Sequence, residues 1–220
     1  MNILVHLLYF LNDRIKLTNS FLYFIKFKAM KYNKICLIKS HISKSSVYVS
    51  GTENIIASEN ALIESCQIYI QGTSNELKIS KNVKLRKTII HIRGSNCKII
   101  IGNNTSFGQV RIVNAGENNN IKIGEDCMFA DNIEIWASDT HTIYDKNKHF
   151  INPERPITIG NKVWVGSHVK ILKGVSINDG AIIGMNSLVT KNLKANTIYA
   201  GNPLREIKSD ITWSSYYRGL

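Results

Sequence analysis

The chain has 220 residues, enough for one elongated domain with caps, and it carries a formal net charge of +12. The charge is uneven, because residues 1–50 hold eight lysines and arginines against Asp13 alone, a net of +7. This asymmetry indicates an anionic partner, for which a membrane surface, a nucleic acid and an acidic polymer are the candidates. The four cysteines lie about thirty residues apart without a CxxC pair, which excludes a small disulfide scaffold or zinc knuckle. We therefore expect reduced, partly buried thiols in a cytoplasmic protein.

The N-terminal region is apolar in two bursts, Ile3–Leu11 and Phe21–Phe27, which a polar segment at 12–14 separates. Neither burst approaches the roughly 20 residues of a membrane span. No basic residue precedes the first burst and no small-residue cleavage site follows it, so a signal peptide is not expected. Two interpretations stay open. One is an amphipathic anchor through residues 1–35 at the inner membrane face, and the favoured one is a helical cap over residues 1–50.

A long repeat begins near Ser50, and its equivalent positions form columns in the sequence. One predicted inward column holds Ala57, Ile79, Ile101 and Ile123, a second holds Ile63, Leu85, Phe107 and Phe129, and a glycine column holds Gly72, Gly94 and Gly116. We interpret each unit as a triangular coil of three six-residue sides with a four-residue bulge at one corner. Glycine and asparagine supply turns that need a positive φ. A β-helix of roughly seven coils is therefore expected to start near residue 50.

The spacing breaks once, where ASDTHTIYDKNKHFINPERP follows Ile133–Trp136. A long irregular insertion in a rigid solenoid is usually functional. It contains the titratable or aromatic side chains of Asp139, His141, Tyr144, His149 and Arg155, and of its two histidines we interpret His149 as a bystander.

A six-residue repeat then runs from Ile157 to Leu204. Every sixth residue from Ile159 is aliphatic, and a small or apolar residue follows each one four places later. A period of six fits neither an amphipathic helix nor a hairpin, but it fits a short strand plus a corner. Three such units make one triangular coil, so we expect Ile159 to stack on Ile177.

The ordered motifs SDTH–IYD, INPERPITIGNKVWVGSHVKILKGV and AGNP resemble those of the hexapeptide-repeat acyltransferases. The resembling branch acetylates bacterial surface polysaccharides and galactosides. The resemblance covers residues 100–213 well and 50–100 only through the repeat. It implies an all-β, left-handed parallel β-helix, whereas the general rule for crossovers favours the right hand. The expected division is a cap at 1–50, a catalytic β-helix at 51–204 with its loop at 139–156, and a tail at 205–220.

The resemblance also implies roles for single residues. His141 would be the general base, since an imidazole with a pKa near 6.5 can take a proton from a hydroxyl at neutral pH. Either Asp139 or a backbone carbonyl would orient its ring. Trp164, at an outward position, would line the acyl-donor tunnel, or else pack under the loop. The remaining expected donor contacts are Ser167, Met185, Thr190, Lys191, Arg205 and Lys208.

The function that these expectations describe is an acetyl-CoA-dependent O-acetyltransferase. It would act on a hydroxyl of a capsular or lipopolysaccharide-type sugar, as a homotrimer with sites between subunits. The positive charge favours an anionic, sialic-acid-containing glycan, and no nucleic acid or metal is expected. The alternatives are N-acetylation of an amino sugar and a non-catalytic scaffold. A zinc-dependent carbonic anhydrase is disfavoured, because the six histidines form no close, repeated ligand pair.

Overall fold

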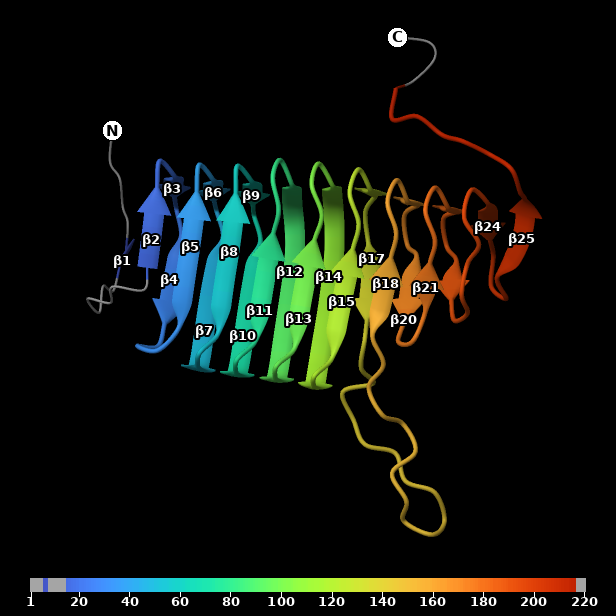
Figure 1. Cartoon of the computed structure of the whole chain (residues 1–220), viewed down its shortest axis with the longest axis horizontal. Helices are drawn as coiled ribbons and strands as arrows, with labels where there is room; N and C mark the ends of the chain where they lie inside the picture. The colour runs from blue at the N-terminus through green and yellow to red at the C-terminus, as the bar shows by residue number, and fades with distance from the viewer. Residues whose placement is uncertain (1–5, 8–14, 217–220) are drawn as a thin grey trace.

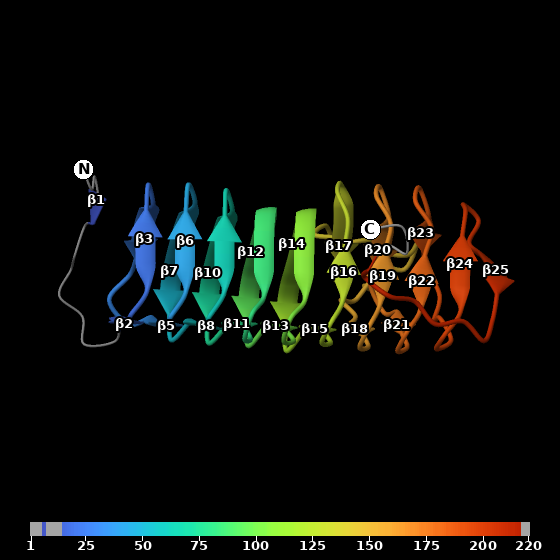
Figure 2. The same ribbon diagram turned by 90° about the horizontal axis from the view of Figure 1, so that it is seen from above.

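The computed structural model describes residues 6–7 and 15–216, and every regular element within them is a β-strand. The strands wind into a straight solenoid whose coils are stacked along its long axis, with one loop projecting from its side (Figure 1, Figure 2). Each coil contributes a strand to each of three faces, and neighbouring coils pair in parallel.

Face 1 is an eight-stranded parallel sheet. Its strands are β2 (Ile15–Thr18), β5 (Lys34–Ile38), β8 (Ile55–Glu59), β11 (Glu76–Ile79), β13 (Lys98–Ile101), β15 (Asn120–Ile123), β18 (Ile157–Ile159) and β21 (Ser176–Ile177). Face 2 holds β3 (Phe21–Tyr23), β6 (His41–Ser43), β9 (Leu62–Glu64), β16 (Met128–Phe129), β19 (Trp164–Val165), β22 (Ile182–Ile183), β24 (Ile198–Ala200) and the antiparallel β25 (Arg205–Lys208). Face 3 holds β1 (His6–Leu7), β4 (Lys26–Ala29), β7 (Ser46–Thr52), β10 (Gln67–Thr73), β17 (Ile133–Trp136), β20 (Lys170–Leu172) and β23 (Leu188–Val189). Two long strands, β12 (Lys84–Ser95) and β14 (Ser106–Glu117), bend from face 2 into face 3.

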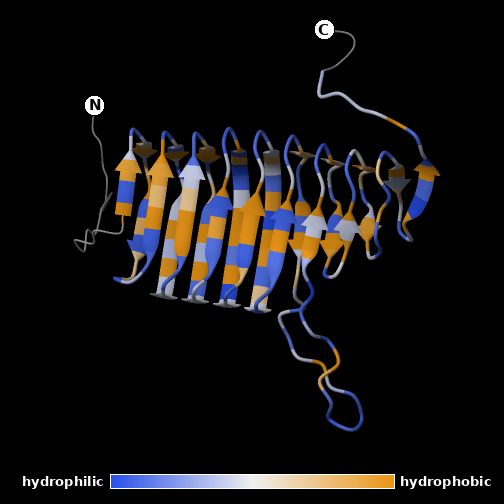
Figure 3. Cartoon of the chain, in the orientation of Figure 1, coloured by the Kyte–Doolittle hydropathy of each residue, from blue (hydrophilic) through white to orange (hydrophobic). Residues whose placement is uncertain are grey.

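The core is a set of inward columns that run along the solenoid, because side chains alternate in and out of each strand. Figure 3 shows the corresponding alternation of hydrophobic and hydrophilic residues along the strands. Ile159 pairs with Ile177 as predicted, and both side chains are 1% exposed. The predicted column of Ile63, Leu85, Phe107 and Phe129 is confirmed in register. Burial of one such side chain contributes about 1.5–3 kcal/mol, so the stacked columns hold the coils together.

The N-terminal prediction of a helical cap is wrong for the described residues. Residues 15–49 form strands β2 to β7, which pair in parallel with the coils that follow. The strands alternate by two: Leu17 on β2 and Leu37 on β5 face inward, whereas Lys16 and Lys34 on the same two strands face outward. The β-helix thus starts well before residue 50. The part of the anchor segment at residues 1–5 and 8–14 lies outside the described residues, and the described ones contain no helix that could span a membrane.

Uneven coil length explains why the sequence period missed this region. On face 1, Ile15 pairs with Ile35, Ile35 pairs with Ile56, and Leu77 pairs with Ile99. The step from one coil to the next therefore lengthens by one residue and later by one more. As a result, the predicted column that begins with Ala57 and Ile79 is wrong at Ala57. This residue pairs with the outward Lys78 and not with the inward Ile79.

The glycine column lies at the predicted corner, where the extra residues of the long coils lengthen the strand. Gly72 pairs with Gly94, and Gly94 pairs with Gly116. Gly94 has a φ of +136°, and a Cβ there would lie 1.9 Å from the carbonyl oxygen of Gly116. Only glycine lets successive backbones approach this closely.

Candidate active site

The loop between β17 and β18, residues 137–156, is the one large interruption of the described solenoid (Figure 1). On face 1, Ile121 pairs with Ile157 across the loop, whereas Ile159 pairs with Ile177 in the next coil. The coil that carries the loop is thus twice as long as the one after it. It closes again after the loop, so the insertion is tolerated without a break in the face-1 sheet.

The loop, which we call the finger, contains no strand, as expected for an irregular insertion, but its two arms meet at one antiparallel bridge between Tyr144 and Phe150. The Ile151 N–H donates to the Ile143 carbonyl over 3.0 Å. At the far tip, the Asp145 carboxylate accepts the backbone N–H of His149 at 2.9 Å and contacts its ring at 3.1 Å. These bonds give the finger a fixed shape. Four large side chains of the finger are half or more exposed: Ile143, Tyr144, Phe150 and Ile151.

Lys173, from the corner after β20, fixes the base of this finger. Its Nζ donates to Asp139 Oδ2 at 2.6 Å, to the Asn152 carbonyl at 3.0 Å and to the Pro153 carbonyl at 3.1 Å. The lysine side chain is only 18% exposed, so these bonds are partly shielded from water. The hydrogen bond from Lys173, followed by the one from Asn152, lowers the pKa of Asp139 below its usual range.

Asn152 connects the hydrogen bonds of Lys173, which we call the Lys173 clamp, to His141. Its Nδ2 donates to Asp139 Oδ2 and to the His141 carbonyl, both over 2.8 Å, and its Oδ1 accepts the Ile143 N–H. Asp139 thus holds the backbone of His141 through Asn152. Its observed partners are Lys173 and Asn152, and the orientation of the His141 ring by Asp139 stays a prediction. Sequence reasoning missed Asn152 and Lys173, because their roles depend on how the two arms of the finger meet.

The backbone just before His141 is strained. Thr140 has a φ of +60°, and it is the one β-branched residue with a positive φ in the described part of the chain. A left-handed conformation costs roughly 1–2 kcal/mol for a residue of this kind. Its N–H is held by Ser138 Oγ at 2.9 Å. Such strain is characteristic of functional segments, and here it exposes the next side chain, His141.

His141 lines one end of a pocket of about 460 Å³ on face 3. Trp136 and Arg111 form the adjacent wall, and His91 and Arg93 lie further toward the N-terminal coils. Burial, and then the charges of Arg111 and Arg93, lower the pKa of His91. No sequence motif marks these residues as functional. The coil repeat, which puts His91 and Arg93 at defined outward positions of one coil, was the available signal.

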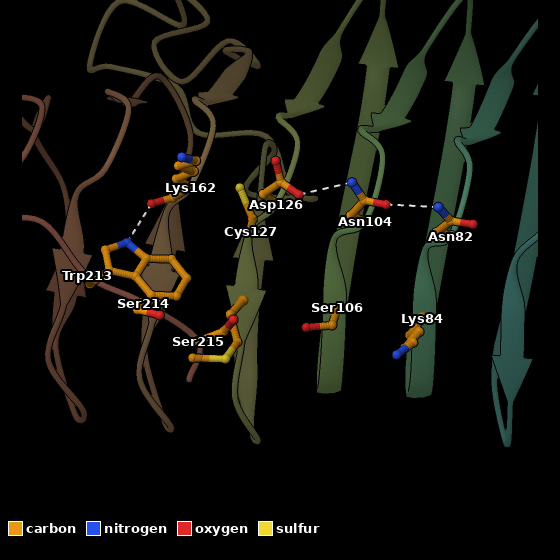
Figure 4. A pocket seen from close by; sticks show the side chains of 11 residues that line it. Asn82, Lys84, Asn104, Ser106, Asp126, Cys127, Lys162, Trp213, Ser214 and Ser215 are labelled. Atoms are coloured by element: carbon orange, nitrogen blue, oxygen red, sulfur yellow. Dashed lines mark hydrogen bonds between the residues drawn. The ribbon is translucent and has the colours of Figure 1, made fainter. Parts of the chain in front are cut away.

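Trp164 lies outward on face 2, as its place in the hexad predicted, and it is 38% exposed. It does not meet His141 within one chain, because His141 opens onto face 3. Trp213 of the tail packs against it with ring centroids 5.9 Å apart, and the Trp213 indole N–H donates to the Lys162 carbonyl at 2.7 Å. The tail residues Trp213, Ser214 and Ser215 line a second pocket of about 590 Å³. Figure 4 shows these residues and, along the upper edge of the pocket, a ladder of hydrogen bonds from Asn82 through Asn104 to Asp126.

The predicted donor residues fall into three groups. Ser167 and Met185 are neighbours in successive coils at the corner between faces 2 and 3. Thr190 and Lys191 follow β23, at the corner from which the loop also projects two coils earlier. Arg205 and Lys208 begin and end the antiparallel β25. All except the half-buried Ser167 are exposed, and one chain does not bring the three groups together.

The cysteines are free thiols buried wholly or in part. Burial raises the pKa of Cys66 and of Cys127 to about 11, so both stay protonated at neutral pH and are poor nucleophiles. Among the described residues, no group of three or more His, Cys, Asp or Glu side chains could hold a metal ion.

Comparison with known proteins places this geometry in context. Residues 156–191 match the family model for the bacterial transferase hexapeptide (six repeats). The chain is 40% identical over 81 residues to the galactoside O-acetyltransferase of Escherichia coli (strain K12), covering 37% of this chain and 40% of that protein. It is 38% identical over 90 residues to the polysialic acid O-acetyltransferase of Escherichia coli O1:K1 / APEC, covering 40% of this chain and 29% of that protein. These matches span less than half the length of either relative.

Two solved structures resemble the whole solenoid. The polysialic-acid-specific acetyltransferase NeuO superposes with a TM-score of 0.71 at 30% identity, covering 94% of this chain and 91% of that one. The polysialic acid O-acetyltransferase OatWY superposes with a TM-score of 0.69 at 26% identity, covering 91% of this chain and 93% of that one. Since the identity, the hexad model and the stacked coils agree, this chain belongs to the hexapeptide-repeat acyltransferase family and has its left-handed parallel β-helix.

Proposed function

We propose that this chain is an acetyl-CoA-dependent O-acetyltransferase that modifies a hydroxyl of a surface glycan, with a sialic-acid-containing chain as the acceptor. The observation that carries the proposal is the position of His141. Its ring is exposed beside a pinned hairpin, at the end of a pocket that also holds Arg93 and Arg111. The names of the relatives, which act on galactosides and on polysialic acid, support acetyl transfer to a sugar hydroxyl.

The proposed reaction needs one proton acceptor. A ring nitrogen of His141 takes the proton of the sugar hydroxyl as its oxygen attacks the thioester carbonyl. The new C–O bond forms, the C–S bond breaks, and the thiolate of coenzyme A leaves with the proton that the imidazolium returns. The Lys173 clamp and Asn152 keep the His141 backbone in place. This pre-organisation lowers the entropic cost of bringing the ring to the hydroxyl. In this scheme Asp139 is a positioning residue.

The separation of His141 from Trp164 supports a site shared between subunits of a homotrimer. The tryptophan would line the donor tunnel of a neighbouring subunit, with Ser167 and Met185 beside it along the pantetheine arm and Thr190 closing it. Lys191, Arg205 and Lys208 would face the phosphates of acetyl-CoA, because exposed cations pair with phosphate groups. The exposed apolar side chains of the finger would be covered by the neighbouring subunit, since large exposed apolar patches mark interfaces.

The test is the His141→Ala variant. We expect kcat to fall about 10²–10⁴-fold, the size of a lost general base, while calorimetry shows unchanged affinity for acetyl-CoA. His149→Ala is the matched control, because this second histidine of the same finger pairs with Asp145 at the far tip. Retention of more than about half of the activity by His141→Ala would contradict the proposal.

The acceptor panel for this assay contains sialylated, neutral and amino sugars. Ester formation on sialylated chains supports the proposal, and transfer to an amino group would instead identify an N-acetyltransferase. A protein that neither transfers acetyl groups nor hydrolyses acetyl-CoA would be a non-catalytic scaffold.

We also propose that the enzyme works in the cytoplasm, at the inner face of the membrane. The free thiols support a reducing compartment. Phe21 and Phe24 are more than half exposed near Lys26 and Lys28, a combination that suits an anionic bilayer surface. Sedimentation with anionic but not neutral vesicles, lost in Phe21→Ser/Phe24→Ser, would support this location.

A further inference from the structure

A ladder of outward rings runs along face 3 toward the pocket at His141. Tyr48, Tyr69 and His91 pair in register on β7, β10 and β12. The centroids of Tyr48 and Tyr69 are 5.4 Å apart with nearly parallel planes, and those of Tyr69 and His91 are 4.9 Å apart. The column continues through Val113 to Trp136, which lines the pocket with His141.

The stacking of the rings determines which of their atoms a ligand can contact. Because each ring covers the face of its neighbour, the rings offer mainly their edges: two phenolic hydroxyls and an imidazole. The Tyr69 hydroxyl donates to Gln67 Oε1 at 3.3 Å, so toward a sugar it acts as an acceptor. Coils are spaced ~4.8 Å apart, so the pocket wall from Tyr69 to Trp136 is about 14 Å long. The ladder is therefore a rigid row of hydrogen-bonding edges rather than a stacking platform for bases.

Two arginines flank the ladder. Arg93 lies two residues beyond His91 on β12, and Arg111 lies on β14 at the other side of the row. Neither guanidinium has an ion pair among the described residues. Glu134 is the acidic neighbour of Arg111 in the next coil. Its carboxylate accepts a hydrogen bond from the Trp136 indole N–H at 2.8 Å and forms an ion pair with Lys170 at 3.4 Å. The pocket therefore has two free guanidiniums on neighbouring coils.

We propose that this ring–arginine groove, formed by Tyr69, His91, Arg93 and Arg111, binds several units of a carboxylate-bearing glycan and delivers one unit to His141. Guanidinium binds carboxylate in a bidentate manner, and the ring edges bond sugar hydroxyls. Successive coils repeat these groups at a regular interval, as a polymer repeats its carboxylates. The inference rests on the proposed acetyl transfer and adds the location of the acceptor and its polymeric form.

The test measures binding without acetyl-CoA, so that it does not depend on catalysis. The probes are a polymer of sialic acid, the same polymer with its carboxylates reduced to alcohols, and free sialic acid. We expect Arg93→Gln/Arg111→Gln to raise the Kd for the polymer about a hundredfold, roughly tenfold for each guanidinium. The reduced polymer and the monomer should bind wild type weakly.

Lys78→Gln/Lys122→Gln is the matched control, because it removes two exposed positive charges from face 1. It should leave the Kd nearly unchanged, and equal losses in the two double variants would overturn the proposal in favour of nonspecific charge. Wild-type binding that survives carboxylate reduction would overturn it as well, as would tighter binding of single-stranded DNA than of the glycan. Tyr69→Phe, which removes one ring-edge hydroxyl, should weaken binding only a few-fold.

Acetyl-CoA hydrolysis without acceptor separates the two proposals. The arginine variant should hydrolyse acetyl-CoA as wild type does and show a raised KM for the polymer with unchanged kcat. Loss of hydrolysis in this variant would show damage to the catalytic site and overturn the assignment of the groove. Failure of the acetyl-transfer proposal would instead appear as unaffected activity in His141→Ala.

Discussion

Lys173→Met should release the base of the finger at residues 137–156 and leave the solenoid intact. The substitution removes three hydrogen bonds from one ammonium, to Asp139 and to the carbonyls of Asn152 and Pro153. A hydrogen bond to a charged group is worth about 1.5–3 kcal/mol when shielded. The Asp139 side chain is 41% exposed, so its share falls toward the roughly 0–1 kcal/mol of a surface pair. We therefore expect a loss of about 2 kcal/mol from the closed finger, which raises its open population about thirtyfold.

Amide hydrogen exchange measures this opening directly. The Ile143–Ile151 and Arg155–Ala137 backbone bonds report on the finger, and the amides of β13 report on the core. In Lys173→Met, finger amides should exchange about thirtyfold faster while core amides are unchanged. If His141 is the base, as proposed, activity should fall up to about 10²-fold, because a misplaced imidazole loses its near-attack geometry.

Lys170→Met is the control, because Lys170 lies three residues earlier in β20 and makes only an exposed ion pair with Glu134 at 3.4 Å. It should change finger exchange by less than a factor of about five. A double-mutant cycle with Asp139→Asn isolates the ionic part of the clamp. The reasoning would be refuted if Lys173→Met kept wild-type exchange and activity, or if Lys170→Met opened the finger equally.

Two further predictions concern the protonation of Asp139 and the sharing of sites between subunits. Lys173 and Asn152 lower the pKa of Asp139, so its contribution is complete above the ordinary carboxyl pKa of about 4 and is lost as pH falls through the lowered value. Finger exchange, corrected for its intrinsic pH dependence, should therefore rise only at acid pH, and an opening centred near neutrality would contradict this. If sites are shared between subunits, mixing inactive His141→Ala with inactive Trp164→Ala chains should restore part of the activity, and mixed trimers without activity would refute the shared site.

The hexads after Ile157 predicted the fold because their spacing is constant. The Ile159–Ile177 pair needed no knowledge beyond three hexads to a coil. The N-terminal coils were missed because they lengthen gradually along face 1, so no fixed period aligns Ile15 with Leu77. Two-residue alternation was present there, but short apolar bursts beside lysines also fit a helix.

The positions of the candidate site residues were predictable only where a motif specified them. The exposed His141 beside the pocket and the outward Trp164 were found where their motifs indicated. Asn152 was missed because its side chain joins two arms of a finger whose return path the sequence does not specify. Arg93 and Arg111 were missed because outward positions carry no packing constraint, so a functional residue there breaks no repeat.

The strand assignment also divides the N-terminal lysines between faces, which changes how the charge of this region is understood. Lys26 and Lys28 lie outward on β4, and Lys28 pairs with Tyr48 at the start of the ring ladder. Lys34 lies outward on β5, on face 1. Only the first two lie on the face of the ring–arginine groove, where Lys28, Tyr48, Tyr69 and His91 occupy successive coils of one row. A polyanion bound along this row would meet a positive charge at its N-terminal end. The excess charge of this region is therefore divided between two faces, with Lys26 and Lys28 on face 3 and Lys34 on face 1.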